Sequence, residues 1–262
     1  MRSIVTVGLM LIVLYPLSPL LLIEEIIKRF SPETCYRHTY NMIHLLMKVI
    51  RRVCGTEIEL IGFENIPKDR PVLYVSNHRS YFDIFMTYAI TETQVGYVAK
   101  KEIAKIPLTR PWMENMHCIF LDRDDIRSGM KMIQEGSDTL KNGTSMWIYP
   151  EGHATNTDTM LPFKGGSFKL ATKARCPILP VTIWGTENIY ERHRPWVKKT
   201  KITLIYGEPI ETAGMSREDE RNLPETVQNI IIQNLRDLAI RDGREPADPP
   251  IDPDLWEKRN EI

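Results

Sequence analysis

Short apolar runs alternate with amphipathic segments from residue 56 onward. Seven runs are rich in β-branched and aromatic residues, and we expect each to form a strand: EIELIGF, PVLYVSN, VGYVA, CIFLD, SMWIYP, PILPVTIWG and KITLIYG. Helical stretches such as DIFMTYAI, DIRSGMKMIQEGSDTLKNG and SFKLATKAR lie between several of them. This alternation predicts an α/β fold with a mixed, largely parallel sheet flanked by helices. A last helix over 216–242 is expected to be interrupted near Pro224.

The beginning of the chain follows a different pattern. Residues 3–23 carry no charge, and a helix of that length would be about 31 Å long, close to the hydrocarbon thickness of a bilayer. Pro16 and Pro19 are expected to kink or break it, so the segment either spans the membrane or enters it partly. A cleavable signal peptide is the alternative, but the run is long and ends in Ile23-Glu24-Glu25, which is no small-residue cleavage site. We interpret it as a retained membrane anchor.

A second amphipathic segment follows the anchor. Ser31-Pro32-Glu33 is typical of a helix start, with a capping hydroxyl, a proline in the first turn and an acid beside it. An apolar stripe then recurs at helical spacing and comprises Tyr36, Tyr40, Ile43, Met47 and Ile50. The stripe fits a helix packed on the core. Directly behind an anchor, and with several basic residues beside it, we favour a helix lying in the lipid headgroup layer. The same basic residues predict, by the positive-inside tendency, that the rest of the chain is cytoplasmic.

Charge and cysteine usage exclude several classes of function. The chain has 34 basic and 34 acidic residues, so its net charge gives no indication of a nucleic-acid partner. Its four cysteines are scattered without a C-x-x-C pair, which argues against a disulfide framework and favours a reducing compartment. No second histidine or cysteine lies at ligand spacing from the histidine discussed next, so we expect no metal and no cofactor.

The stretch SNHRSYFD, residues 76–83, places a histidine at the end of an apolar run and an aspartate five residues later. On a regular helix His78 and Asp83 would point to different faces, but across a strand-to-helix turn they can meet. A carboxylate on one imidazole nitrogen would leave the other nitrogen to take a proton. Asp83 also fits a second role, because Ser80-x-x-Asp83 is typical of a helix start. His78 on its own could equally be a structural histidine.

The chain offers no protein nucleophile to accompany this base. It contains no G-x-S-x-G elbow, which disfavours a soluble α/β-hydrolase, and no reactive cysteine motif. A base without a nucleophile indicates activation of a substrate hydroxyl, and therefore direct acyl transfer.

Four ordered blocks resemble the glycerolipid acyltransferase family of the 1-acyl-sn-glycerol-3-phosphate (lysophosphatidic acid) acyltransferase type. The first is Asn77-His78-x-x-x-x-Asp83, the family's HX4D motif. The second comprises Lys100-Lys101-Glu102 with Ile106-Pro107, and then residues 118–123. The third is Tyr149-Pro150-Glu151-Gly152 followed by FKGGS, and the fourth is Ile178-Leu179-Pro180-Val181. The resemblance covers roughly residues 70–185, and it also implies a membrane-binding helical segment at the start of the chain.

This resemblance implies a mechanism and a division of roles. His78 would be the general base on a glycerol hydroxyl that attacks the thioester of acyl-CoA or acyl-carrier protein, and Asp83 would orient it. The acceptor and its phosphate would be bound by Lys100, Lys101, Arg123, Glu151, Gly152 and Lys164. Asn77, Pro150 and Pro180 would support the motifs. Expected partners are membrane lipids, the thioester donor and a lysophospholipid acceptor. The three parts would be a membrane segment 1–54, a catalytic domain 55–242 and an extended or disordered tail 243–262.

The third block departs from the family pattern. It commonly reads Phe-Pro-Glu-Gly-Thr-Arg-Ser, whereas this chain has His153 at the threonine and Ala154 at the arginine. An arginine fork matches the geometry of a phosphate, so another cation replaces it or the acceptor is a different lipid. Arg123 is the first candidate replacement, Lys100 the second and Arg110 the third. A lapsed, catalytically inactive lipid-binding protein on the same fold is the alternative outside enzymes.

Overall fold

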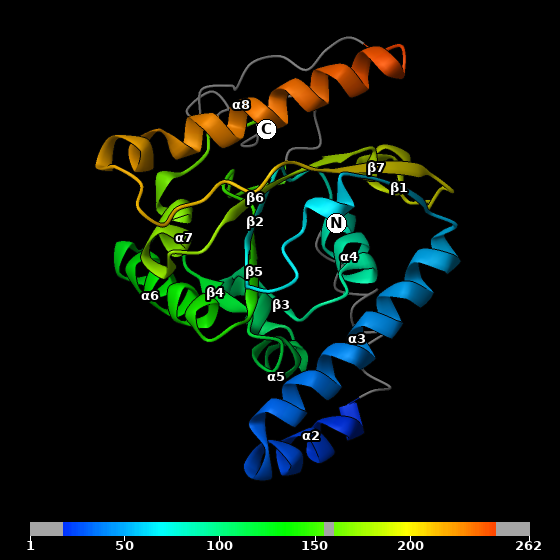
Figure 1. Ribbon diagram of the computed structural model, residues 1–262. Coiled ribbons are helices and arrows are strands. Elements are labelled where there is room, and N and C mark those ends of the chain that lie inside the picture. The colour runs from blue at the N-terminus through cyan, green and yellow to red at the C-terminus, as the bar shows by residue number, and fades with distance from the viewer. Residues whose placement is uncertain (1–17, 155–159, 245–262) are drawn as a thin grey trace.

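The computed structural model describes residues 18–154 and 160–244, and within them seven strands form one sheet (Figure 1). The strand order is β1-β7-β6-β2-β5-β3-β4. The strands are β1 (Glu57–Ile61), β2 (Leu73–Ser76), β3 (Val95–Lys100), β4 (Ile119–Leu121), β5 (Ser145–Ile148), β6 (Ile178–Trp184) and β7 (Lys201–Tyr206). Only the β6–β7 pair in this sheet is antiparallel. The predicted mixed, largely parallel sheet is confirmed, and β2 to β6 end at the same edge.

Helices cover both faces of the sheet. The longer ones are α2 (Ser18–Phe30), α3 (Pro32–Cys54), α4 (Phe82–Ile90), α5 (Thr109–Glu114), α6 (Ile126–Lys141), α7 (Lys169–Ala174) and α8 (Arg217–Arg241). Figure 1 shows α6, α7 and α8 on one side of the sheet and α3 and α4 on the other. Strand alternation explains the two layers, because Leu73 and Val75 pack with the first group and Tyr74 between them packs with the second.

Helix α3 begins where its sequence signals predicted. The Ser31 hydroxyl accepts the Thr34 N–H at 3.4 Å, and Gly55 ends the helix in the left-handed conformation with φ 67°. The predicted stripe faces inward, since Tyr40, Ile43 and Met47 are buried in the core that α4 shares. The stripe therefore belongs to the protein core, where burial against α4 removes these side chains from water. The position of the helix in the lipid headgroup layer stays a prediction.

A second apolar row on the outside of α3 is exposed instead. Leu45, Val49 and Val53 recur at intervals of four residues, and Val53 is 82 % exposed. Helix α2 likewise leaves Leu22, Ile23, Ile26 and Phe30 exposed. The amphipathic segment thus has two apolar faces, of which one serves the protein core.

The ends of the described chain bear on two other expectations. The predicted anchor 3–23 lies largely outside the described residues, and only residues 18–23 appear, in α2. Among residues 18–154 and 160–244, no helix is long and apolar enough to cross a membrane. Helix α8 continues unbroken through Pro224, contrary to the predicted interruption. The proline removes one backbone N–H from the helix, but the buried side chains on both sides of it keep the helical pattern. Most of the predicted tail, from residue 245, is also outside the described part.

Candidate active site

The predicted strand-to-helix turn lies at the carboxyl edge of the sheet. Strand β2 ends at Ser76, and α4 begins at Phe82. Asn77 continues the pairing of β2 with β6 through its side chain, which donates to the Ile183 carbonyl at 2.9 Å and accepts the Ile183 N–H at 2.8 Å. The predicted supporting role of Asn77 thus has a physical basis, because the amide fixes where the chain leaves the sheet.

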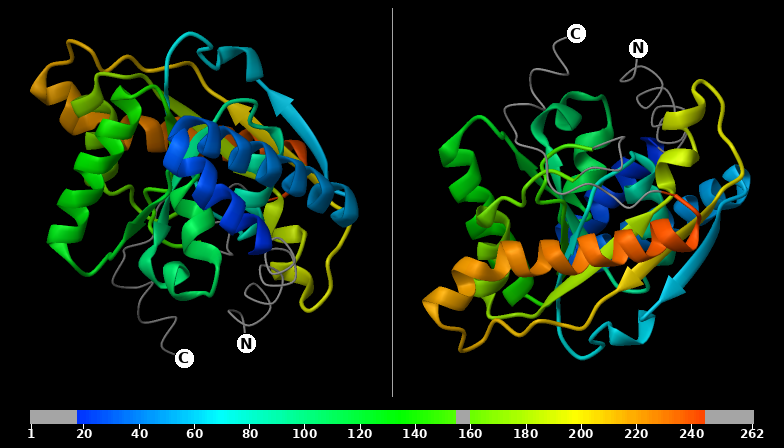
Figure 2. Two further views of the ribbon diagram at one scale, coloured as in Figure 1. Left: turned by 90° about the horizontal axis from the view of Figure 1, so that it is seen from below. Right: turned by 90° about the horizontal axis from the view of Figure 1, so that it is seen from above.

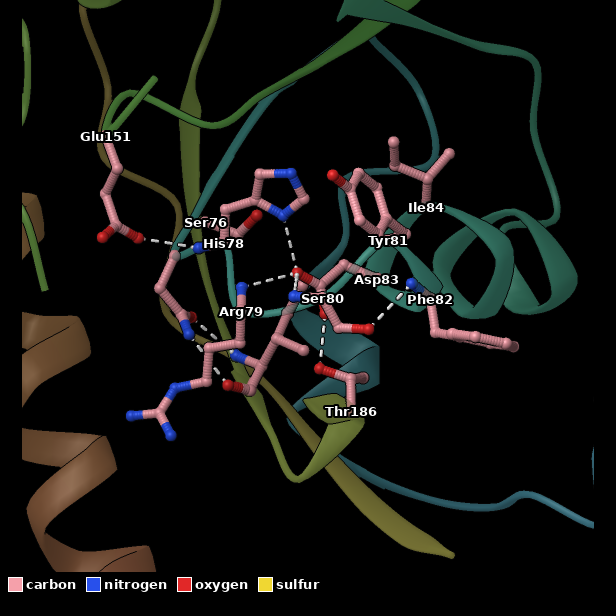
Figure 3. Close-up of polar contacts among 12 residues, drawn as sticks. Ser76, His78, Arg79, Ser80, Tyr81, Phe82, Asp83, Ile84, Glu151 and Thr186 are labelled. Atoms are coloured by element: carbon pink, nitrogen blue, oxygen red, sulfur yellow. Dashed lines mark hydrogen bonds and ion pairs between the residues drawn. The ribbon is translucent and has the colours of Figure 1, made fainter. Parts of the chain in front are cut away.

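Asp83 and His78 meet across this turn. His78 Nδ1 lies 2.7 Å from Asp83 Oδ2, as the turn geometry predicted (Figure 3). Asp83 is completely buried and also accepts the N–H groups of Arg79 at 2.8 Å and Ser80 at 3.0 Å. Thr186, which follows β6 in a short 3₁₀ turn, donates its hydroxyl to the other carboxylate oxygen at 2.5 Å. Asp83 therefore caps the turn and holds the imidazole at the same time, so its two possible roles coexist.

The contact with Asp83 decides which imidazole nitrogen can act as a base. An ionised Asp83 carboxylate only accepts hydrogen bonds, so it pairs with an N–H at Nδ1 of His78, and Nε2 is then the nitrogen that can accept a proton. The ring stacks on Tyr149 with centroids 4.2 Å apart and planes inclined by 23°. The ring is thus held on its edge and on its face.

Glu151 is built into the backbone of the site. Its side chain is buried, and its two oxygens accept different N–H groups, from His78 at 2.7 Å and from Leu161 at 2.9 Å. Burial raises the pKa of Glu151 to about 8, while those two N–H donors and the charge of Arg79 oppose the rise. This carboxylate therefore links the turn of His78 to the backbone at Leu161. Its acceptor-binding role, which the resemblance implies, stays a prediction.

We expect Glu151→Gln to lower kcat more than it raises the acceptor KM. A glutamine has one accepting oxygen, so one of the two buried N–H groups would face its NH₂ group, at a cost of about 1–3 kcal/mol. The backbone of His78 would shift, and the melting temperature would fall with kcat. Steady-state kinetics with both substrates varied separate the effects. A variant with unchanged kcat and a raised acceptor KM would instead restore the acceptor-binding role.

Basic side chains gather on the β3 and β4 side of His78. Lys100 ends β3, Arg123 follows β4, and Lys164 lies against the turn after β5, where a Cβ on Gly152 would come within 3.3 Å of its Nζ. Partial burial and then the charges of Arg123, Lys164 and Lys100 lower the pKa of His153. Gly152 adopts φ 81°, a conformation that favours glycine. The charges of three of the four predicted phosphate-binding cations therefore act on His153.

The fourth predicted phosphate-binding cation, Lys101, and the third candidate replacement, Arg110, pair more closely with acids than Lys100, which lies 3.7 Å from Glu102. The Lys101 ammonium donates to the Asp122 carboxylate, which raises the pKa of this lysine. Arg110, on α5, pairs with Glu114 one helical turn away at 2.7 Å. Neither is among the largest contributions to the lowered pKa of His153.

The remaining motif residues are structural. The Pro150 carbonyl accepts the Lys164 N–H at 3.1 Å, which ties the FKGGS segment to the turn after β5. Pro180 lies within β6, opposite Val75 of β2, and its carbonyl accepts the Gly207 N–H at 2.9 Å. Among the described residues, no cluster of histidine, cysteine or carboxylate side chains is arranged to hold a metal ion.

Sequence reasoning missed three residues that fix the site. Thr186 contacts Asp83, and Glu191 accepts the Ser80 hydroxyl at 2.8 Å and the Tyr81 N–H at 3.1 Å. Gln228 of α8 donates to the Leu161 carbonyl at 3.0 Å and accepts the Phe163 N–H at 3.4 Å. Each lies more than 60 residues from its partner, and no local pattern marks it.

Comparisons with known proteins agree with this geometry. The signature of the family described as Acyltransferase matches residues 57–184, which include His78, Asp83 and Glu151. A Saccharomyces cerevisiae protein named 1-acyl-sn-glycerol-3-phosphate acyltransferase is 28% identical over 73% of this chain, and the match spans 64% of that relative. A Mycoplasma pneumoniae protein described as a probable enzyme of the same name is 28% identical over 80% of this chain and 81% of its own.

A solved structure is also similar. It is the crystal structure of the 1-acyl-sn-glycerophosphate acyltransferase PlsC from Thermotoga maritima, with a TM-score of 0.72 and 28% identity. The match covers 89% of this chain and 92% of that one. With four motif blocks in order, the matched signature and this shared fold, the chain belongs to the acyltransferase family and is an enzyme of that type.

Proposed function

We propose that this enzyme transfers a fatty acyl group from a thioester to the free hydroxyl of 1-acyl-sn-glycerol-3-phosphate. The observation that carries the proposal is the His78–Asp83 pair at the carboxyl edge of the sheet, together with three cations, Lys100, Arg123 and Lys164, whose charges lower the pKa of His153. The first group suits a base that activates a hydroxyl, and the second suits a phosphate on the same acceptor. The names of the relatives support this acceptor.

In the proposed reaction, His78 takes one proton from the acceptor hydroxyl and later gives it to the leaving thiolate. Nε2 of His78 takes the proton of the acceptor hydroxyl as its oxygen attacks the thioester carbonyl carbon. The tetrahedral intermediate collapses, the C–S bond breaks, and the thiolate of CoA or of the acyl-carrier protein takes the proton back from the imidazolium. Asp83 stabilises the imidazolium and keeps Nε2 directed away from the turn. General-base catalysis of this kind contributes about 10²–10⁴ in rate.

The phosphate would be bound by Lys100, Arg123 and Lys164, with His153 among them. Arg123 is partly buried, and burial lowers the pKa of its guanidinium, so an anion in contact with it would be stabilised strongly. These cations would supply what Ala154 lacks.

The proposed acceptor lies in a membrane, and the exposed apolar residues of α2 and α3 would hold the enzyme there. Phe30 is 87 % exposed, and Lys28, Arg29, Arg51 and Arg52 lie near the ends of the two helices. Apolar side chains next to basic ones suit the headgroup layer of a bilayer. The predicted anchor and the predicted cytoplasmic position of the catalytic part belong to this proposal.

We expect the double variant Phe30→Glu/Val53→Glu to bind lipid vesicles at least tenfold more weakly than wild type. The two glutamates remove apolar contact and add charge that anionic lipids repel. Vesicle co-sedimentation measures the effect, and Ile240→Glu, an exposed apolar residue on α8, is the matched control. Equal losses in the two variants would contradict a specific role for α2 and α3.

An acceptor panel with one labelled acyl-CoA tests the function itself. The panel comprises lysophosphatidic acid, lysophosphatidylcholine, monoacylglycerol and glycerol-3-phosphate, assayed on purified protein in detergent. We expect thiol release and labelled product chiefly with lysophosphatidic acid. Efficient transfer to monoacylglycerol would overturn the phosphate requirement. Lipid binding without thiol release from acyl-CoA or acyl-carrier protein would favour a lapsed lipid-binding protein.

A further inference from the structure

The segment between β6 and β7 exposes a large aromatic side chain. Residues 191–199 read ERHRPWVKK and are called the 191–199 loop below. Trp196 is 69 % exposed and Val197 is 45 % exposed. Both views of Figure 2 show this yellow stretch projecting at the edge of the molecule. Three other tryptophans of the described chain, Trp112, Trp147 and Trp184, are almost completely buried, so the exposure of Trp196 needs an explanation.

The charges of the loop indicate what covers the indole. Four of its nine residues are lysine or arginine, and its one acid, Glu191, points inward to Ser80. Arg192 and Lys199 also face acids, Glu187 at 3.5 Å and Glu57 at 2.9 Å. Arg194 lies over the Tyr190 ring, 5.4 Å from its centroid, and Lys198 is exposed. A tryptophan among basic residues suits the boundary between headgroups and acyl chains of an anionic bilayer.

The inner end of the loop is fastened to the catalytic turn. Glu191 accepts hydrogen bonds from Ser80 and Tyr81, and Asp83 binds the Ser80 N–H. Five residues separate Glu191 from Trp196, so the two Cα atoms are at most about 18 Å apart. A surface that contacts Trp196 is therefore held close to His78.

The outer end of the loop meets the surface already proposed for α3. A Cβ on Gly55, the residue that ends α3, would lie 3.2 Å from Cγ of Lys199. Val53, two residues earlier, belongs to the exposed row of α3. The loop thus meets the end of α3 that carries Val53, although Gly55 and Lys199 are 144 residues apart in the chain.

We propose that the 191–199 loop is a second membrane contact, in which Trp196 enters the headgroup layer of an anionic bilayer. The contact holds the edge of the sheet that carries His78 against the lipid surface from which the acceptor enters. The α2 and α3 helices attach the enzyme, and the loop sets its orientation. The inference extends the proposed membrane-bound function, but vesicle binding tests it without any catalytic step.

Two measurements on the full chain test the proposal. The first is binding to vesicles of phosphatidylcholine with phosphatidylglycerol, compared with phosphatidylcholine alone. We expect Trp196→Ala to lower binding about tenfold, because the variant loses a large apolar side chain that would be buried in the bilayer. Lys198→Gln should lower it about fivefold, and only on anionic vesicles. The matched control is Ile61→Ala, since Ile61 is 40 % exposed at the end of β1, at the opposite edge of the sheet from His78, and should change binding less than twofold.

The second measurement locates the indole directly. In a Trp256→Phe background, lipid with brominated acyl chains should quench part of the tryptophan fluorescence. This quenching should disappear when Trp196→Phe is added. Transfer between water-soluble, short-chain substrates should be unchanged in Trp196→Ala, because Trp196 is mostly exposed and the hydrogen bonds of the loop to the catalytic turn come from Glu191. Equal binding of Trp196→Ala and Ile61→Ala, or quenching that survives Trp196→Phe, would overturn the proposal. An inactive wild type that still shows the quenching would refute the proposed reaction and leave this membrane contact standing.

Discussion

His78→Ala should lower the turnover of acyl transfer by about 10²–10⁴ while leaving the melting temperature within a few degrees of wild type. The imidazole projects from a turn at the edge of the sheet, where its Nδ1 lies 2.7 Å from the Asp83 carboxylate. Its removal deletes the base but no part of either hydrophobic core. Assays of thiol release measure the turnover, and thermal unfolding measures the melting temperature. Retention of more than a few per cent of turnover would show that another group takes the proton.

Asp83→Asn is the informative companion to this variant. An asparagine oxygen can still accept one hydrogen bond, but its NH₂ group must face some of the donors that now meet the carboxylate, namely His78, Arg79, Ser80 and Thr186. We therefore expect both turnover and melting temperature to fall, in contrast to His78→Ala. A lower melting temperature with unchanged turnover would mean that Asp83 only caps the turn.

The parts of the site that sequence could predict are those that depend on local pattern. Alternating apolar runs mark the strands, and parallel strands bring their carboxyl ends to one edge. Strands β2, β5, β3 and β4 are neighbours in that order, so His78, Glu151, Lys100 and Arg123 follow one another along it. The contact between His78 and Asp83 was predictable because only five residues and one turn separate them.

The parts that escaped prediction depend on which segments fold against each other. Thr186 and Glu191 reach the turn of His78 from more than 100 residues away, and Gln228 reaches the segment beside Glu151 from α8. The spacing of the apolar stripe of α3 was predictable from the sequence. Its burial in the protein core was not, since lipid and a protein core attract the same side chains. Lys101 looked equivalent to Lys100 in sequence, and the pairing with Asp122 separates them.

The third block lacks the arginine of the family pattern, and the structure narrows the candidates for the cation that replaces it. Arg123 acts on His153, is partly buried, and follows β4 at the same edge as His78. Arg110 is exposed and engaged with Glu114. A phosphate held in a partly buried site without a cation would be costly, so the candidate whose charge acts most on His153 should matter most.

Arg123→Ala should raise the acceptor KM by about 30-fold and change the acyl-donor KM and kcat little. A charged hydrogen bond to a phosphate contributes about 1.5–3 kcal/mol, and its loss affects acceptor binding because the base and its carboxylate stay in place. Arg110→Ala is the matched control and should leave both KM values unchanged. In the Arg123→Ala background, Ala154→Arg should restore part of the acceptor affinity, since it returns the cation that related acyltransferases carry in the third block. Acceptor kinetics that are insensitive to Arg123→Ala, or equal use of phosphate-free acceptors by the wild type, would refute this phosphate site while leaving the base mechanism of His78 intact.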